Sequence, residues 1–131
     1  MSHTLIKTPG EDHPIAITPN PSRVVVRVRG ETVAETVRAL TVSEASLAAI
    51  HYIPREDIKM NFLESVAHVS YCPYKGTASY FDLVVAGARH VRAAWSYEAP
   101  HDALWEISEL VAFMTGQAAC VEEWERSDGK A

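Results

Sequence analysis

Residues 23–29 alternate in a way that an extended strand explains better than a helix does. Valine recurs at every second position of this run, and arginine fills most of the positions between. Successive side chains on a strand point to opposite faces, so one face here is apolar and the other mostly cationic. This is typical of a half-buried antiparallel strand. Gly30-Glu31 reads as a compact turn, and residues 32–40 return as a second β-rich run, which predicts a hairpin.

The rest of the chain predicts more short strands and few helices. Further strands are expected at residues 50–53, 68–72, 77–85, 91–97 and 120–124. The segment Pro54–Asp57 resembles one helical turn, because proline is tolerated at the first helical position and acids suit the N-terminal dipole. Apolar residues at helical spacing over residues 103–111 predict an amphipathic helix that Asp102 caps. The expected fold class is therefore mainly β, an antiparallel meander with one or two short helices.

A chain of 131 residues has the length of a single domain. We expect a flexible N-terminal arm over residues 1–13, the domain over residues 14–124, and a frayed tail over residues 125–131. The apolar runs fall far short of the roughly 18 residues that a membrane span needs. The first residues also lack the basic and apolar segments of a signal peptide, so a cytoplasmic protein without membrane contact is expected.

The cysteine content and the net charge argue against two classes of function, zinc binding and nucleic-acid binding. The only cysteines are Cys72 and Cys120, and no Cys-x-x-Cys pair exists, so no zinc site of the usual kind is expected and no cofactor is assigned. The formal net charge is −5, with the acids concentrated after residue 97. Nucleic-acid binding is not expected, because its electrostatic signature is basic.

The loop Tyr71-Cys72-Pro73-Tyr74-Lys75-Gly76 is the most site-like feature of the sequence. Pro73 holds Cys72 extended at the mouth of the loop. Lys75 is near enough through the turn to lower the pKa of the thiol, so Cys72 and Lys75 are the candidate catalytic residues. Two plainer interpretations stay open: a buried structural thiol, and a hairpin in which Lys75 is solvated.

Aromatic residues gather around the same loop. Tyr71, Tyr74 and Tyr80 share one predicted hairpin, and Trp95 and Tyr97 lie on the next strand. Such a cluster could line a pocket for a planar ligand, because small-molecule sites are mostly apolar with a few polar groups. Core packing, with the phenol hydroxyls reaching surface partners, is the alternative interpretation.

Ordered motifs across the chain resemble the family of domains of unknown function numbered 427, which is sometimes labelled nucleotidyltransferase-like. The resemblance covers roughly residues 13–124. The motifs that carry it are Ala34-x-Thr36, Glu44, Tyr52-Ile53-Pro54-x-x-Asp57, Tyr71-Cys72-Pro73-Tyr74-Lys75-Gly76-x-Ala78-x-Tyr80, Ala94-Trp95-Ser96-Tyr97-x-x-Pro100, Ile107 and Val111-Ala112-Phe113.

The resemblance implies a β-tent-like fold and a polar, aromatic set of site residues. Relatives with that fold hold zinc through two Cys-x-x-Cys pairs, which this chain lacks, so no zinc site is carried over. The ligand-binding residues that the resemblance implies are Arg38, Glu44, Tyr52, Arg55, Asp57, Tyr71, Tyr74, Tyr80, Trp95 and Tyr97, beside Cys72 and Lys75.

Two functions follow as expectations. The first is a small-molecule-binding domain, in a non-catalytic or an enzymatic version, whose partner is a small molecule with an anionic or planar group. Arg38 or Arg55 would contact the anion, and Trp95 would form an aromatic wall. The alternative is a non-catalytic protein-interaction module that docks a basic partner through the acidic C-terminal third.

Overall fold

The computed structural model describes residues 5–115 and the backbone of residues 123–127. This part is one mainly β domain with antiparallel pairing throughout, which confirms the predicted fold class. Its elements follow the chain in this order: β1 Ile15–Asn20, β2 Arg23–Val28, β3 Glu31–Thr36, β4 Ala39–Glu44, β5 Ile50–Tyr52, η1 Arg55–Asp57, η2 Met60–Phe62, β6 Leu63–Cys72, β7 Gly76–Val85, β8 Ala88–Ser96, η3 Asp102–Ile107, β9 Val111–Phe113 and β10 Glu123–Ser127.

A long hairpin, bent halfway along, forms the first third of the domain. Its turn is Arg29-Gly30, one residue earlier than expected, and both residues have positive φ (51° and 80°), as a tight two-residue hairpin turn requires. Farther from the turn, Pro21 interrupts one arm, and the other breaks at Val37-Arg38. Proline cannot donate to a strand ladder. Pro21 therefore separates β1 from β2 in one arm, and the break at Val37-Arg38 separates β3 from β4 in the other.

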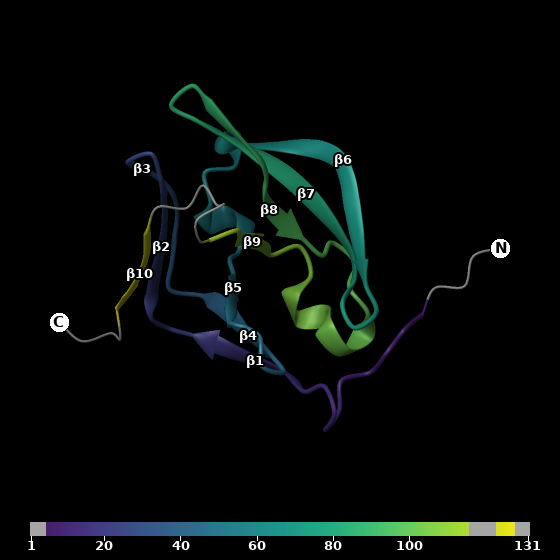
Figure 1. The fold of residues 1–131 in the computed structure, drawn as a ribbon. Coiled ribbons are helices and arrows are strands. Elements are labelled where there is room, and N and C mark those ends of the chain that lie inside the picture. Colours follow the sequence, from purple (N-terminus) through teal and green to yellow (C-terminus); the bar gives the residue numbers. More distant parts are fainter. Residues whose placement is uncertain (1–4, 116–122, 128–131) are drawn as a thin grey trace.

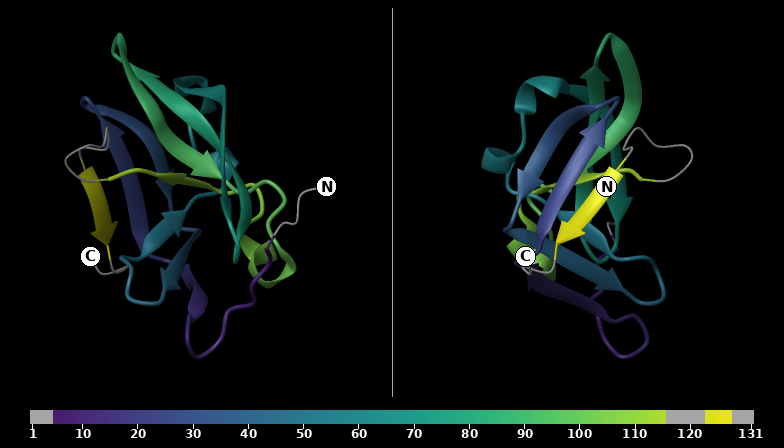
Figure 2. Two further views of the ribbon diagram at one scale, coloured as in Figure 1. Left: turned by 45° about the vertical axis from the view of Figure 1, so that its right-hand side comes forward. Right: turned by 90° about the vertical axis from the view of Figure 1, so that its left-hand side faces the viewer.

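The bend distributes the hairpin between two sheets. The half nearest the turn joins the last strand in the order β10-β2-β3, and the other half forms the order β1-β4-β5. Figure 2 shows β10 lying beside β2. The third sheet is the meander β6-β7-β8-β9, which faces the bent hairpin in Figure 1. Reciprocal backbone hydrogen bonds of 2.9 Å between Ile53 and Val111 fasten β5 to β9.

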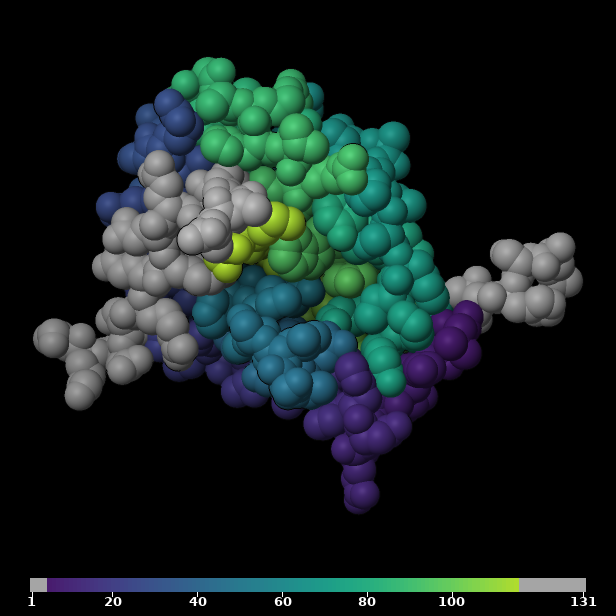
Figure 3. All heavy atoms as spheres, in the orientation of Figure 1, coloured from purple at the N-terminus to yellow at the C-terminus, as the bar shows by residue number. Residues whose placement is uncertain are grey.

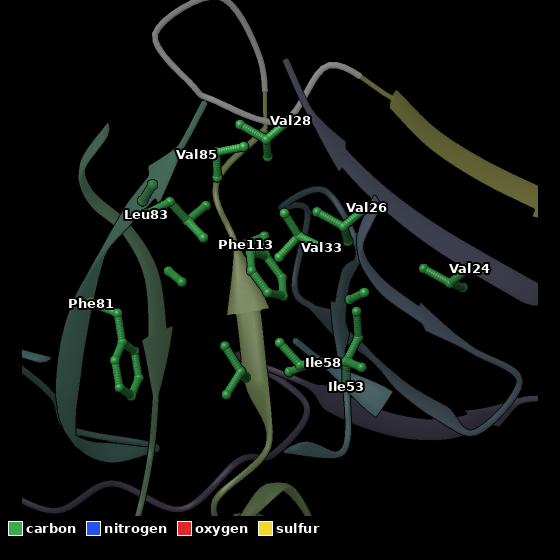
Figure 4. Packing of buried hydrophobic residues seen from close by; sticks show 14 of the residues in the cluster. Val24, Val26, Val28, Val33, Ile53, Ile58, Phe81, Leu83, Val85 and Phe113 are labelled. Carbon is green, nitrogen blue, oxygen red and sulfur yellow. The ribbon is translucent and has the colours of Figure 1, made fainter. Parts of the chain in front are cut away.

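Two apolar clusters lie on opposite faces of the meander sheet. All three residues of β9 are buried, and Val111 and Phe113 point into the first cluster while Ala112 points into the second. Figure 4 shows Phe113 in the first cluster, between Leu83 of β7 and Val33 of β3. The second cluster lies between the meander and the β1-β4-β5 sheet, and it contains most of the candidate site.

The predicted amphipathic helix is only partly correct. The structure has a 3-10 helix over Asp102–Ile107, kinked at Leu104, and its N-cap is His101 without a side-chain cap. Asp102 therefore does not act as the cap. Val111 belongs to β9, because pairing with Ser96 and Ile53 satisfies its backbone better than one more helical turn would.

The other boundaries follow the predictions with small shifts. The meander strands begin earlier than expected, β6 at Leu63 and β8 at Ala88, and the turn at Pro54–Asp57 is present as η1. Part of the predicted last strand, with Cys120, lies outside the described residues, as do residues 128–131 of the predicted tail. No helix in the described ranges is long and apolar enough to cross a membrane.

Candidate functional site

The β6–β7 connection positions the central residues of the candidate site. Cys72 pairs with Gly76 at the ends of the two strands, which leaves Pro73, Tyr74 and Lys75 as the loop. Gly76 has a φ of +108°, a conformation that L residues rarely adopt, so glycine is needed at this position. The carbonyl oxygen of Lys75 accepts a 2.9 Å hydrogen bond from the backbone of His101, which ties the loop to the start of η3.

Lys75 points inward and belongs to a row of three polar side chains. Its ammonium donates to Oε1 of Glu44 on β4, and Oε2 of Glu44 lies 2.8 Å from Nε2 of His13. The side chains of His13, Glu44 and Lys75 are 27%, 14% and 8% exposed, so the row runs from the surface into the domain. Burial opposes ionisation of Glu44, but the hydrogen bonds from Lys75 and His13 outweigh it and lower the pKa of this carboxyl.

Aromatic side chains lie beside the inner end of this row. Tyr52 of β5 and Tyr97 are buried, with ring centroids 6.4 Å apart, and the indole Nε1 of Trp95 donates to the Tyr52 hydroxyl at 3.3 Å. Cys72 and Tyr80 pack against the same cluster. Burial raises the pKa of Tyr52 to about 12 and that of Tyr97 further still, so both phenols stay protonated at neutral pH.

A surface groove of about 350 Å³ lies at the Trp95 side of the cluster. The residues that line it are mostly apolar and come from three segments: Leu47, Ala48, Ala49, Ile50, Trp95, Phe113, Met114 and Thr115. Figure 3 shows the hollow on this face, where the blue β4–β5 segment approaches the yellow-green end of β9. Leu47 and Met114 are exposed at its rim. Trp95 therefore contacts the groove with its ring and the buried tyrosine cluster with its N–H.

Tyr71 and Tyr74 lie on the outer side of the loop, against the segment that was expected to be an arm. The hydroxyl of Tyr71 donates to the carbonyl of Leu5 and lies 3.0 Å from Nε2 of His101. The backbone N–H of Lys7 donates to the carbonyl of Pro73 at 3.0 Å. The Tyr74 ring stacks on His13, with centroids 4.1 Å apart and an interplanar angle of 10°.

Arg38 and Asp57 lie elsewhere, at the bend of the long hairpin. Arg38 contacts both carboxylate oxygens of Asp57, and Thr36 donates to one of them at 2.7 Å. These hydrogen bonds, those from Arg38 first, lower the pKa of Asp57. The arrangement links η1 to the end of β3. It has the character of a structural clamp at the bend.

Arg55 makes a third, separate group. Its guanidinium donates to the backbone carbonyl of Glu109, the hydroxyl of Ser96 and the carboxylate of Glu98. These partners hold the start of η1 against the end of β8. The ligand-binding residues that the resemblance implied therefore divide into one cluster around Lys75 and Tyr52, the pair Tyr71 and Tyr74 on the outer side of the loop, and two outlying groups around Arg38 and Arg55.

His13 is the site residue that the sequence did not indicate. It is one of six histidines spread along the chain, and 31 residues separate it from its partner Glu44. Only the pairing of Ile15 with Glu44 across β1 and β4 brings the two together. In the described ranges, no three His, Cys, Asp or Glu side chains gather as a metal-binding group.

Comparison with known proteins gives a family but no activity. A family model described as "Domain of unknown function (DUF427)" matches residues 16–126, which is most of the chain. No functionally curated protein matches the sequence. The matched span includes the bent hairpin, the whole meander and the Lys75–Glu44 pair. The chain belongs to the DUF427 family of domains of unknown function.

Proposed function

We propose that this protein is a small-molecule-binding domain whose site is the tyrosine cluster between the Lys75–Glu44 ion pair and the Trp95 groove. The observation that carries the proposal is the burial of that ion pair beside Tyr52 and Tyr97. Removing two charges from water is costly, and buried, hydrogen-bonded charges beside perturbed titratable groups concentrate at functional sites.

The groove supplies the other property that a binding site needs. Ligand sites are mostly apolar, with a small number of polar groups that fix orientation. The residues that line the Trp95 groove are mostly apolar, and the indole N–H of Trp95 donates to the Tyr52 hydroxyl. A planar ligand that stacks on Trp95 fits this groove.

In an enzymatic version of the proposal, Cys72 is the nucleophile and Lys75 its electrostatic partner. Cys72 packs against the tyrosine cluster and is partly exposed, and Lys75 is paired with Glu44 in the adjoining loop. Thiolates are the reactive form of cysteine, and neighbouring cations favour them. The charge of Lys75 is already engaged in the ion pair with Glu44. Ligand binding does not require Cys72 to act as a nucleophile, so the proposed binding function stands without the enzymatic version.

A thermal-shift screen with a metabolite panel tests the proposal. A ligand at about 100 times its dissociation constant adds roughly 2.7 kcal/mol, which is several degrees for a domain of this size. The shift should persist in Trp105→Phe, a matched control because Trp105 is 56% exposed on η3, and should be lost in Trp95→Phe. A shift that Trp95→Phe leaves intact would contradict the location, and the absence of any shift would contradict the function.

The exposure of Trp105 favours a second candidate function, a protein-interaction module. This large aromatic side chain lies in η3 among the exposed acids Asp102, Glu106 and Glu109. Tryptophan is enriched at interface hot spots, and acids around it would favour a basic partner. Capture of a basic partner that Asp102→Lys/Glu106→Lys abolishes, and that Trp95→Phe leaves intact, would favour this function over the first.

A further inference from the structure

The contacts of His13 are those of a bound ring rather than those of a surface side chain. Its imidazole lies parallel to the Tyr74 ring at 4.1 Å, and its Nε2 is 2.8 Å from the Glu44 carboxylate. Stacking combines with a hydrogen bond to a charged acceptor, which is about twice as strong as a neutral one. The stack on Tyr74 therefore fixes the plane of the imidazole ring, and the hydrogen bond with Glu44 fixes which edge of the ring faces the carboxylate.

The partners of His13 are held in place by residues other than His13. The second oxygen of Glu44 binds Lys75, and Tyr74 belongs to the loop that Gly76 and the Lys75–His101 backbone bond position. Against the effect of burial, the hydrogen bond from Lys75 lowers the pKa of Glu44 independently of His13, which favours the ionised carboxylate. An aromatic face and an oriented carboxylate would therefore remain if His13 moved away.

The segment that carries His13 is attached to the domain lightly. Within residues 5–13, only Pro9 and His13 are even partly buried. The segment's backbone contacts to the loop are the Lys7–Pro73 bond and the Leu5 carbonyl, which accepts from Tyr71. Releasing it exposes little apolar surface, so a ligand could replace it at low cost in free energy.

We propose that the His13 imidazole occupies, from within the chain, a subsite for a planar nitrogen heterocycle that carries an N–H donor. Such a ring would stack on Tyr74, donate to Glu44 and displace residues 5–13 from the loop. The carboxylate selects neutral or cationic rings and disfavours an anionic ring at this end of the site. This inference rests on the proposed function and names the ligand class for the polar end of the same site.

The test uses His13→Ala and free imidazole as the replacement ring. Millimolar imidazole should raise the melting temperature of His13→Ala by about 2 °C or more beyond its effect on the wild type. Adding Tyr74→Leu, which removes the stacking face, should abolish the gain. His101→Ala is the matched control, because His101 meets Tyr71 edge-on, at 5.8 Å and 70°, and its side-chain partner is a phenol rather than a carboxylate.

Equal responses of His13→Ala and His101→Ala to imidazole, or none in a folded His13→Ala, would overturn the subsite. A second measurement uses the wild-type protein and does not depend on the variant folding. On titration with 2-aminobenzimidazole, the ring protons of His13 should move downfield as they leave the Tyr74 face, and the Lys7 amide should exchange faster. Unmoved His13 resonances up to the solubility limit would also overturn it.

These outcomes are separate from those of the proposed function. Imidazole rescue without any ligand response that depends on Trp95 would support the subsite and contradict the proposed site at the groove. Ligand binding that depends on Trp95, with no response at His13, would leave the proposed function intact and remove the subsite.

Discussion

Glu44 on β4 and Lys75 in the β6–β7 loop form an ion pair across 31 residues of sequence, with side chains only 14% and 8% exposed. The pair joins the β1-β4-β5 sheet to the meander at the rim of the second apolar cluster. A fold of this size could have closed the same contact with apolar residues, which avoid the cost of removing charge from water. The cost of burying these two charges is the physical basis for placing the site here.

The first prediction concerns this pair. Lys75→Met should lower the free energy of unfolding by about 3 kcal/mol, because it leaves the Glu44 carboxylate buried without its main partner. The double variant Lys75→Met/Glu44→Leu should recover most of that loss. Urea unfolding curves measure both. As a control, Glu35→Gln breaks an ion pair that is largely exposed and should have a much smaller effect. Additive losses in the double variant would show that the two charges do not interact.

The second prediction concerns the loop backbone. Gly76→Ala should destabilise the protein by at least about 1 kcal/mol, because a φ of +108° is strained for any residue with a Cβ. The added Cβ itself meets only ordinary contacts, the nearest at 3.5 Å, so the loss would report the backbone. Gly10→Ala is the control, since Gly10 has no positive φ and has room for a Cβ. Equal effects of the two substitutions would contradict the strain.

The third prediction is a pH dependence. Asp82 lies where the β7–β8 register shifts, and its carboxylate accepts hydrogen bonds from the Arg92 backbone at 2.8 Å and from Arg89 at 2.9 Å. These bonds, the backbone bond first, lower the pKa of Asp82. Its contribution to stability is therefore complete above about pH 4, near the ordinary carboxyl value, and is lost as the pH falls through the lower folded-state pKa.

Unfolding free energies of the wild type and Asp82→Asn across the acid range measure this contribution. The wild type should be more stable at neutral pH, and the difference should shrink on acidification. Glu56→Gln, at an exposed position of η1, provides a control for the loss of one carboxylate. A difference between wild type and Asp82→Asn that stays constant with pH would contradict the ionic role of Asp82.

The fourth prediction concerns the thiols. Cys72 is partly exposed at the end of β6, beside the Lys75–Glu44 pair, and it should be alkylated faster than Cys120 near neutral pH. Cys72→Ser and Cys120→Ser variants separate the two rates by mass spectrometry. A ligand that binds the tyrosine cluster should also slow the Cys72 reaction. Equal, slow labelling of both thiols in the folded protein would rule out the catalytic version of the proposed function.

Local pattern predicted the strands well where it was regular and poorly where the chain bends. The valine alternation of residues 23–29 predicted β2 correctly, but not its burial, because Val25 on the opposite face is as fully buried as Val24 and Val26. The pattern predicts one strand over residues 32–40, whereas the structure breaks it at Val37-Arg38 into β3 and β4. The break exists because Thr36, Arg38 and Asp57 clamp η1 to that corner, and Asp57 lies 19 residues beyond Arg38.

The helix predicted after Pro100 is also longer than the observed one. Apolar residues at helical spacing predicted one helix as far as Val111, yet the structure stops it at Ile107. The backbone of Val111 instead bonds to Ile53, a residue 58 positions earlier in the chain. Helical propensity is a weak preference, and a strand pairing that also buries both faces of β9 outweighs it.

The sequence alone determined the mainly β class and the loop from Tyr71 to Gly76, because these depend on local periodicity and on residue type. The resemblance to the DUF427 family implied the aromatic and charged residues around that loop. Only the tertiary structure decided which of them meet. In the folded protein Lys75 pairs with Glu44 and His13 stacks on Tyr74. Arg38, Asp57 and Arg55 lie away from the cluster. The physical reason is that strand pairing determines which side chains are neighbours across the sheets. The register of β1 with β4 depends on both strands and cannot be deduced from the sequence of either one.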